Sequence, residues 1–274
     1  MSDHIFANHA HVFPPAVRPE GSVERLLRHL DACEIERAVC FAPFAEQVED
    51  VDEHHNRWLA AELAPYADRL IGFGTIDFTR RDFDEQVREI AQLGFKGIKL
   101  HPNHQRFDVV SNEAHTVYAA AEVHHLFVSF HTGVHHGRIR HYNVLLFDEV
   151  AHYHPRLRFS MEHVGGYHFF TEAMAVIFNN IPFPPDPTRR PRVFGGLTSV
   201  FAPDHLRFWH LRREQLLELV AQVGAGQLIF GLDFPYNQEE HTKLAIETIN
   251  GLGLSDHDRA MILGGTVRRE LGLT

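Results

Sequence analysis

Histidines spaced one residue apart are a common way for a chain to hold a metal ion, and this chain has two such triplets. They are His9-Ala10-His11 and His152-Tyr153-His154. With 23 histidines among 274 residues, about two such triplets are expected by chance, so the motif alone indicates nothing. The place of each triplet relative to the secondary structure must decide whether it binds a metal.

Eight apolar stretches bounded by turn residues predict eight β-strands. They cover residues 5–12, 37–43, 70–77, 95–101, 126–133, 157–165, 193–200 and 228–235. Apolar residues at helical spacing lie between them, for example over 23–30 and 87–93. This alternation predicts an α/β protein, a single (β/α)8 (TIM) barrel that spans residues 1–274 as one domain. An open doubly wound sheet is the alternative, but no Gly-rich phosphate turn follows the first strand.

Composition sets limits on partners and location. Hydrophobic residues make up 44% of the chain, and the formal net charge is −10. The negative charge argues against nucleic-acid binding, and we find no apolar run long enough for a membrane span and no secretory leader. We therefore expect a cytoplasmic protein whose partner is a small-molecule substrate. Cys33 and Cys40 are expected to be buried, reduced thiols.

In a barrel of this kind, the C-terminal strand ends and the loops after them share one mouth. His9 and His11 close the first strand with both side chains on one face, while Asn8 alternates to the other face. The second triplet instead precedes the sixth strand, at the opposite rim. The proline-rich segment 181–192 is also expected at that opposite face, in packing or in an oligomer contact.

Other strand ends carry matching side chains. The fifth strand ends at His131 in SFHTG, the sixth at His163 in MEHVGG, and the eighth at Asp233 in FGLDFPY. Imidazoles and a carboxylate that converge from separate strands can hold a divalent ion and leave a position for water or substrate. Such residues at the correct end of four of the eight strands are hard to obtain by chance.

These motifs resemble those of the amidohydrolase superfamily, in particular the amidohydrolase-2 branch that includes relatives of aminocarboxymuconate-semialdehyde decarboxylase. The resemblance spans nearly the whole chain and rests on NHAHV, GFKGIKLHP, HTG, EHVGG and GAGQLIFGLDFPY. It implies a metal-dependent barrel and a homodimer. It also implies a catalytic role for His163, and as metal ligands it implies His9, His11, His131 and Asp233.

Two positions depart from the pattern of that family. Asn8 stands where an aspartate is common, and Gly265-Thr266 replaces a usual Asn-Ala pair. By strand parity neither is a direct ligand. An amide at position 8 would support a metal ligand less strongly than a carboxylate does, which is compatible with weaker metal retention.

Three more residues are candidates for substrate binding. Lys99 faces the barrel interior by alternation, and substrate binding or structural pairing is favoured over the metal-bridging carboxylated lysine of binuclear superfamily members. His101 lies at the tip of the fourth strand. Arg138, in the loop 131–143, is suited to recognise a carboxylate, with a solvated surface role as the alternative.

Together these residues predict a metal-dependent hydrolase that acts through a metal-activated water. The family resemblance implies that its substrate is a small, carboxylated organic molecule. One divalent ion is expected, with zinc as the first choice and manganese or iron(II) as alternatives. Asp233 would accept the proton of the water, and His163 would polarise the substrate carbonyl. Non-oxidative decarboxylation of an aromatic or unsaturated carboxylate in the same site is the alternative. A catalytically silent ligand-binding barrel is the alternative of another class.

Overall fold

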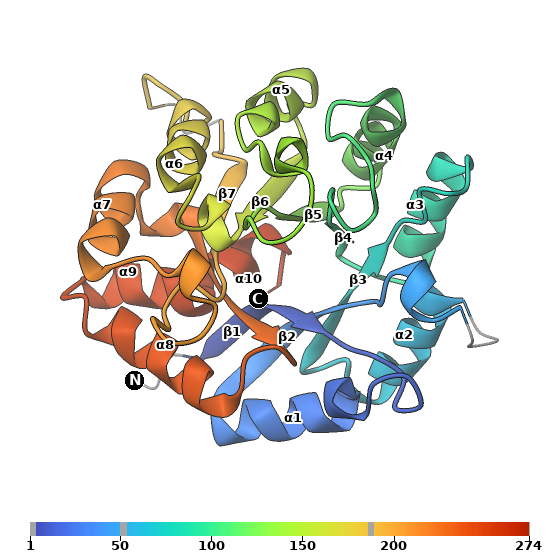
Figure 1. Ribbon diagram of the computed structural model, residues 1–274, viewed down its shortest axis with the longest axis horizontal. Helices are drawn as coiled ribbons and strands as arrows, with labels where there is room; N and C mark the ends of the chain where they lie inside the picture. Colours follow the sequence, from blue (N-terminus) through green and yellow to red (C-terminus); the bar gives the residue numbers. More distant parts are fainter. Residues whose placement is uncertain (1–3, 50–53, 186–188, 274) are drawn as a thin grey trace.

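The computed structural model describes residues 4–49, 54–185 and 189–273, which form a closed barrel of eight parallel strands (Figure 1). Each strand pairs with the next along the chain, and β8 pairs with β1. The strands are β1 (Ile5–His11), β2 (Ile35–Phe41), β3 (Leu70–Thr75), β4 (Gly97–Leu100), β5 (Phe127–His131), β6 (Arg158–Glu162), β7 (Val193–Leu197) and β8 (Leu228–Phe234). The predicted (β/α)8 barrel is therefore confirmed.

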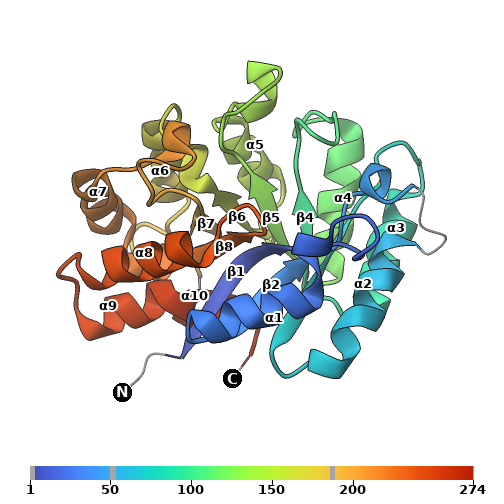
Figure 2. The same ribbon diagram turned by 60° about the horizontal axis from the view of Figure 1, so that its bottom comes forward.

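Helices surround the barrel in a ring, as Figures 1 and 2 show, except for the last one, which lies behind the centre of the barrel in the view of Figure 1. They are α1 (Val23–Ala32), α2 (His55–Leu63), α3 (Phe83–Gln92), α4 (Asn112–Val123), α5 (Leu146–Tyr153), α6 (Phe170–Asn179), α7 (Arg213–Val223), α8 (Glu239–Asn250), α9 (Asp256–Ala260) and α10 (Thr266–Glu270). Local sequence fixes several of their starts. Ser22 and Ser111, for example, cap α1 and α4 by accepting a hydrogen bond from a backbone N–H three residues later.

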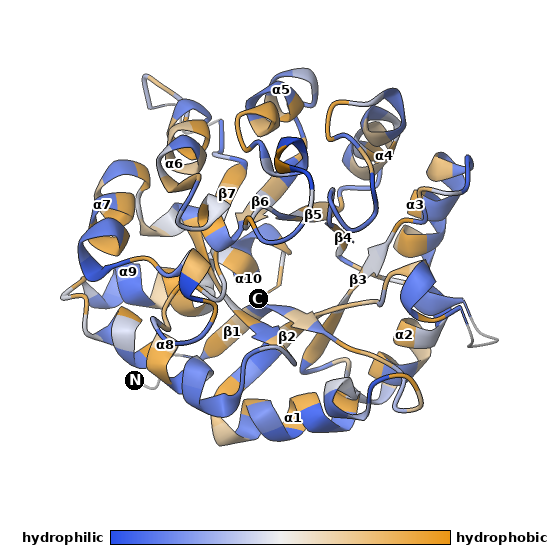
Figure 3. Ribbon diagram, viewed as in Figure 1, coloured by the Kyte–Doolittle hydropathy of each residue, from blue (hydrophilic) through white to orange (hydrophobic). Residues whose placement is uncertain are grey.

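The apolar residues form two layers, one between the strands and the helices and one inside the barrel. The surrounding helices carry hydrophobic and hydrophilic residues in alternation along their length, as Figure 3 shows, because one side packs on the strands. Inside the barrel, Val267 of α10 and Leu271 pack against a group of strand residues. That group is Phe6, Val39, Phe41, Ile71, Phe73, Phe127, Phe194 and Ile229. Apolar side chains thus fill the end of the barrel near α10. The polar side chains of the candidate site lie toward the C-terminal ends of the strands.

Several other expectations can be compared with the described residues. Cys33 and Cys40 are free and buried, as predicted. The proline-rich segment connects α6 to β7 and so lies at the face opposite the strand ends, although 186–188 fall outside the described residues. Within 4–49, 54–185 and 189–273, none of the helices has the length and apolar character needed to cross a membrane.

Candidate metal centre

Three of the expected metal ligands converge at the mouth of the barrel. His9 and His11 come from β1 and Asp233 from the neighbouring β8, and one ligand atom of each lies within 4.8 Å of the others. His9 Nε2 is 3.4 Å and His11 Nε2 is 3.9 Å from Asp233 Oδ1. These three residues are called the inner group below.

The backbone around the inner group departs from regular strand geometry. His9 and Asp233 have φ angles of 68° and 58°, in the left-handed region that residues other than glycine rarely adopt. The pairing of β1 with β2 also shifts register between Ala7 and Ala10. The alternation of side chains is therefore broken, and Asn8 faces the interior beside His9, so the prediction that Asn8 alternates away is wrong. Strained backbone of this kind clusters at functional sites.

Hydrogen bonds decide which atoms the inner group presents. His9 Nδ1 lies 2.9 Å from Glu162 Oε2, and because a carboxylate only accepts, Nδ1 carries the proton and Nε2 a lone pair. Ser199 Oγ donates to Asp233 Oδ2 at 2.6 Å and leaves Oδ1 toward the imidazoles. Burial lowers the pKa of His9 and His11 and raises the pKa of Asp233 to about 6. Neutral nitrogens and a carboxylate are a donor set that fits zinc and similar ions.

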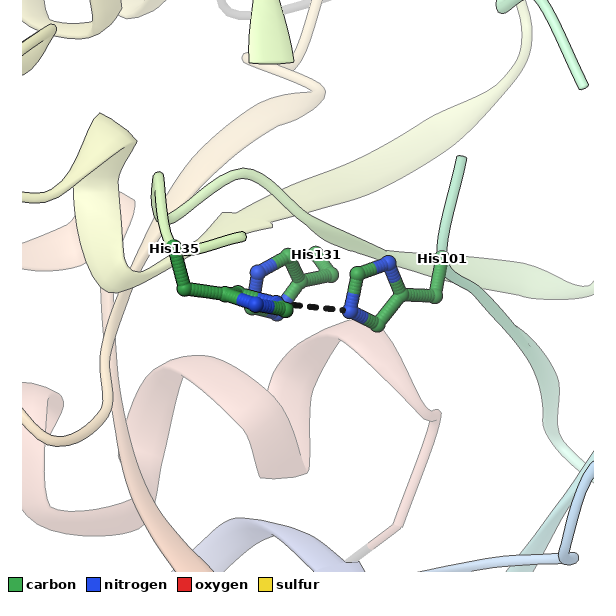
Figure 4. Close-up of side chains that lie close together, drawn as sticks. All are labelled: His101, His131 and His135. Atoms are coloured by element: carbon green, nitrogen blue, oxygen red, sulfur yellow. Dashed lines mark hydrogen bonds between the residues drawn. The ribbon is translucent and has the colours of Figure 1, made fainter. Parts of the chain in front are cut away.

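A second set of imidazoles lies closer to solvent. His101, His131 and His135, called the outer group, also place one ligand atom each within 4.8 Å of the others (Figure 4). The rings of His101 and His131 stack with their centroids 3.8 Å apart, and His135 Nε2 lies 3.3 Å from His101 Nε2. The structure therefore groups His131 with the outer histidines, whereas the sequence analysis placed it among the ligands of the inner group.

Most nitrogens of the outer group already have partners in the protein. His101 Nδ1 accepts a hydrogen bond from the backbone N–H of His104, so the proton of this neutral ring is on Nε2 and is donated to His135. His131 Nε2 donates to the carbonyl oxygen of Gly133 at 2.7 Å. Protein contacts thus engage both ring nitrogens of His101 and Nε2 of His131, so the outer group fits a metal ion less well than the inner group does.

His163 connects the two groups. Its Nδ1 donates to the carbonyl oxygen of Thr198 at 2.8 Å, so its Nε2 carries a lone pair. The Nε2 atom lies 3.1 Å from His131 Nδ1, which also carries a lone pair because His131 donates from Nε2. The His163 ring stacks on Trp209 and lies 5.3 Å from the His9 ring between centroids. Burial lowers the pKa of His163 to about 3, so the ring is neutral near pH 7. Two lone pairs that face each other mark a place suited to a cation or a proton.

Lys99 is fully buried and faces the barrel interior, as alternation predicted. Its Nζ lies 3.3 Å from His9 Nε2 and 4.9 Å from the centre of the Phe41 ring. Burial lowers the pKa of Lys99 to about 8. Lys99 therefore adjoins the inner group but does not line the cavity above it, and its contact with substrate stays a prediction.

The inner and outer groups open into one cavity of about 330 Å³. Its wall is made mostly of aromatic and imidazole side chains. The lining residues are His11, Phe44, Gln47, His101, His104, His131, His135, His136, His163, Leu206, Phe208, Trp209, Asp233 and Tyr236. Among the described residues, no lysine or arginine lines this cavity, and Arg138 is exposed outside it. Carboxylate recognition by Arg138 therefore has no support from the cavity wall.

The sequence reasoning missed two residues of the site. Glu162, directly before His163, is fully buried and accepts the hydrogen bond from His9. An acid at the C-terminal end of a strand, directly before a candidate catalytic histidine, was a signal that could have found it. Trp209 lies in the irregular segment after β7, where no periodic pattern announces a residue of the site.

The comparisons with known proteins agree with this geometry. The sequence profile described as amidohydrolase matches residues 8–273. No curated protein sequence matches the chain. Among solved structures, the chain is similar to 5-carboxyvanillate decarboxylase from Sphingomonas paucimobilis, with 18% identity, full coverage of both chains and a TM-score of 0.73.

Two further structures have similar folds. A putative 2-pyrone-4,6-dicarboxylic acid hydrolase from Pseudomonas putida is 20% identical, with a TM-score of 0.69 over 99% of this chain and 98% of that chain. A dihydroxybenzoic acid decarboxylase from Polaromonas, with bound manganese and an inhibitor, is 15% identical, with a TM-score of 0.69 over 98% and 96% of the two chains. At these identities the structures show a shared fold, whereas the profile spans nearly the entire sequence. This chain therefore belongs to the amidohydrolase family.

Proposed function

We propose that this protein is a metal-dependent hydrolase that acts on a small cyclic organic molecule in the cavity at the barrel mouth. The observation that carries the proposal is the convergence of His9, His11 and Asp233, with ligand atoms within 4.8 Å of one another, beside a cavity of about 330 Å³. A cavity of this size is within the usual range for small-molecule sites. Membership of the amidohydrolase family supports the same reaction class.

The inner group would hold one divalent ion, with zinc as the first choice and manganese or iron(II) as alternatives. His9 offers the lone pair of Nε2 and Asp233 offers Oδ1. His131 is proposed as a further ligand, because its Nδ1 carries a lone pair that is not committed to a protein donor. The manganese in the Polaromonas decarboxylase supports a metal in this fold, although it does not identify the metal here.

When bound, the ion supplies Lewis acidity and lowers the pKa of a water molecule toward neutrality. The residues of the chain then handle the proton. The Asp233 carboxylate accepts it, and the Ser199 hydroxyl, which donates to Oδ2 at 2.6 Å, holds that carboxylate in place. His163 is neutral with an acceptor at Nε2, so we propose that it orients a donor hydroxyl group. Direct polarisation of a carbonyl, as expected from the sequence, would need a proton that Nε2 does not carry in this geometry.

The cavity wall favours a planar ring as substrate. Phe44, Phe208, Trp209 and Tyr236 line it, and His101 presents a ring that stacks on His131. Because no arginine or lysine of the described residues lines it, one carboxylate of the substrate would have to face the inner group.

We also propose, as expected from the sequence, that the protein is cytoplasmic and forms a homodimer.

Non-oxidative decarboxylation is the second candidate. A wall without cationic side chains offers no binding partner for a carboxylate distant from the metal, which favours a ring with a single carboxylate at the inner group. Two of the similar structures are decarboxylases of aromatic acids. The silent ligand-binding barrel remains the alternative of another class.

Elemental analysis of protein purified without chelator, followed by a substrate panel, tests these proposals. Cyclic lactones with carboxylate groups would report hydrolysis by ring opening, and hydroxylated benzoates would report decarboxylation by release of carbon dioxide. We expect near-stoichiometric divalent metal and one of the two products. Protein that neither retains nor binds added zinc, manganese or iron(II) and turns over neither class would establish the silent barrel instead.

A further inference from the structure

We infer that Glu162, with Asn8 as its partner, is the positioning residue that sets the tautomer and orientation of His9 for metal binding. The inference rests on the proposed metal site and adds to it a residue outside the ligand set. Glu162 is the last residue of β6 and has no exposed surface. It does not line the cavity, and its direct hydrogen bond to a proposed ligand of the inner group is the one to His9.

Five side-chain donors converge on the Glu162 carboxylate. Oε2 accepts from His9 Nδ1 and from Thr198 Oγ1, each at 2.9 Å. Oε1 accepts from Asn8 Nδ2 at 2.9 Å and from the hydroxyl groups of Ser129 and Ser160. These donors come from β1, β5, β6 and the end of β7. A carboxylate with this many donors is held in one orientation, so the direction in which it points the His9 ring is also fixed.

Two glycines leave the space that this network occupies. A Cβ atom at Gly196 of β7 would lie 2.2 Å from Glu162 Oε2. A Cβ atom at Gly231 of β8 would lie 2.1 Å from Thr198 Oγ1, one of the donors. At such distances the carboxylate or its donor would have to move. Glycine at these two positions of β7 and β8 therefore leaves room for the carboxylate and its donors.

Asn8 matches a carboxylate at position 162. Its side chain is buried and its amide Nδ2 donates to Glu162 Oε1 at 2.9 Å, whereas an aspartate at position 8 would put a second carboxylate in that place. Two buried carboxylates at such a distance repel each other strongly. Asn8 Oδ1 is buried with no hydrogen-bond partner among the described residues, which shows that the side chain is placed for its donor rather than for its acceptor. The carboxylate that supports His9 thus comes from β6, and the amide comes from β1.

The consequence for the metal site follows from the chemistry of imidazole. With Glu162 accepting from Nδ1, the lone pair of His9 is confined to Nε2, which lies 3.4 Å from Asp233 Oδ1. Without this acceptor, only Lys99 Nζ, 3.3 Å from Nε2, still favours a lone pair there, and the ring can carry its proton on Nε2 and lose the ligand atom. Loss of such a partner of a metal ligand lowers metal affinity by about 10- to 100-fold.

The test measures the dissociation constant for Zn²⁺ by competition with a chelator for the native chain, Glu162→Gln, Asn8→Asp and the double variant. Glu270→Gln is the matched control, because Glu270 is also a buried glutamate but pairs with Arg158 and Arg269 away from the site. The ¹⁵N shifts of the His9 side chain in metal-free protein report its tautomer independently of activity. Melting temperatures of the metal-free proteins report folding.

We expect Glu162→Gln to weaken Zn²⁺ binding by about 10- to 100-fold and to move His9 from one tautomer to a mixture. Asn8→Asp should weaken binding at least as much, and the double variant should recover part of that loss because it restores one carboxylate and one amide. Glu270→Gln should change the melting temperature but leave Zn²⁺ affinity within about threefold. If Glu162→Gln does not fold, Thr198→Val removes one donor and should shift affinity in the same direction.

Zn²⁺ affinity within threefold of native in folded Glu162→Gln, or an unchanged His9 tautomer, would overturn the inference while leaving the metal site intact. A double variant no better than Asn8→Asp would also count against it. A native chain that binds no Zn²⁺ would instead contradict the proposed function, so the two failures are distinguishable.

Discussion

The inner group and the outer group are both triads of potential ligands at one barrel mouth, yet their surroundings differ. In the inner group, His9 is bonded through Nδ1 to a buried carboxylate and presents a lone pair at Nε2. In the outer group, both ring nitrogens of His101 have protein partners, whereas His131 donates from Nε2 to a backbone carbonyl oxygen and keeps a lone pair at Nδ1, which faces His163. The rings of His101 and His131 lie nearly parallel, 3.8 Å apart between centroids. Proximity of histidines is therefore not sufficient for metal binding. The partner of the other ring nitrogen decides which lone pairs are open.

The largest expected effect comes from the carboxylate of the inner group. Asp233→Asn should lower kcat/KM by about 100- to 10,000-fold, because it removes the proton acceptor and a ligand charge. The fold should survive, since Ser199 can still donate to the amide oxygen. Steady-state kinetics on the substrate found in the panel measures the change, with Asp108→Asn, a partly buried acid that pairs with Arg140, as control. Turnover close to native in Asp233→Asn would remove this residue from the mechanism.

His55, which belongs to neither group, shows how far burial changes the pKa of a histidine and the stability of the fold. Burial lowers the pKa of His55 to about 4, below the 6.5 of the unfolded chain, and its Nε2 lies 3.3 Å from the carbonyl oxygen of Thr75. The unfolded chain thus binds this proton more readily, so the stability that neutral His55 contributes is present above pH 6.5 and is lost as the pH falls toward 4. The loss is on the order of 3 kcal/mol.

Denaturant unfolding of metal-free protein at pH 7 and pH 4 measures that loss, and His55→Gln should reduce it. An equal pH dependence in native protein and His55→Gln would show that acid stability is set by other groups, among them the buried histidines of the inner and outer groups. The inner and outer groups would then have to be compared by the pH at which each gains a proton, as well as by their hydrogen bonds.

The smallest effects are expected in the outer group. His101→Gln should raise KM by about 5-fold through loss of a cavity contact, and it should leave Zn²⁺ affinity within about threefold. Arg138→Ala, outside the cavity wall, should leave both values within about twofold of native, the scatter expected for a surface change. Calorimetric Zn²⁺ titration together with kinetics measures both variants. A second equivalent of Zn²⁺ that disappears in His101→Gln would show that the outer group is a metal site after all.

Much of the barrel could be predicted from local patterns. Eight apolar runs, with helical spacing between them, fix the number and order of strands, because burial on both faces of a parallel strand demands continuous apolar residues. The same order places His9, His11, His131, His163 and Asp233 at one rim, since the ends of parallel strands meet there. The distinction between the two His-x-His triplets follows too. In the structure, His154 of the second triplet bonds His115 instead of joining the mouth.

Only the tertiary structure decided the parts that depend on broken regularity and on contacts between distant strands. The left-handed φ of His9 and the register shift in β1 turn Asn8 inward, and no strand-parity rule contains that step. The hydrogen bonds that Glu162 accepts from Asn8, His9, Ser129 and Thr198 likewise join residues far apart in sequence. The backbone partners of His101 and His131 are only three and two residues away, but the loop conformation that brings them into contact is not contained in the strand pattern. Sequence thus determined which side chains reach the mouth, and packing determined which of their atoms remain free to bind an ion.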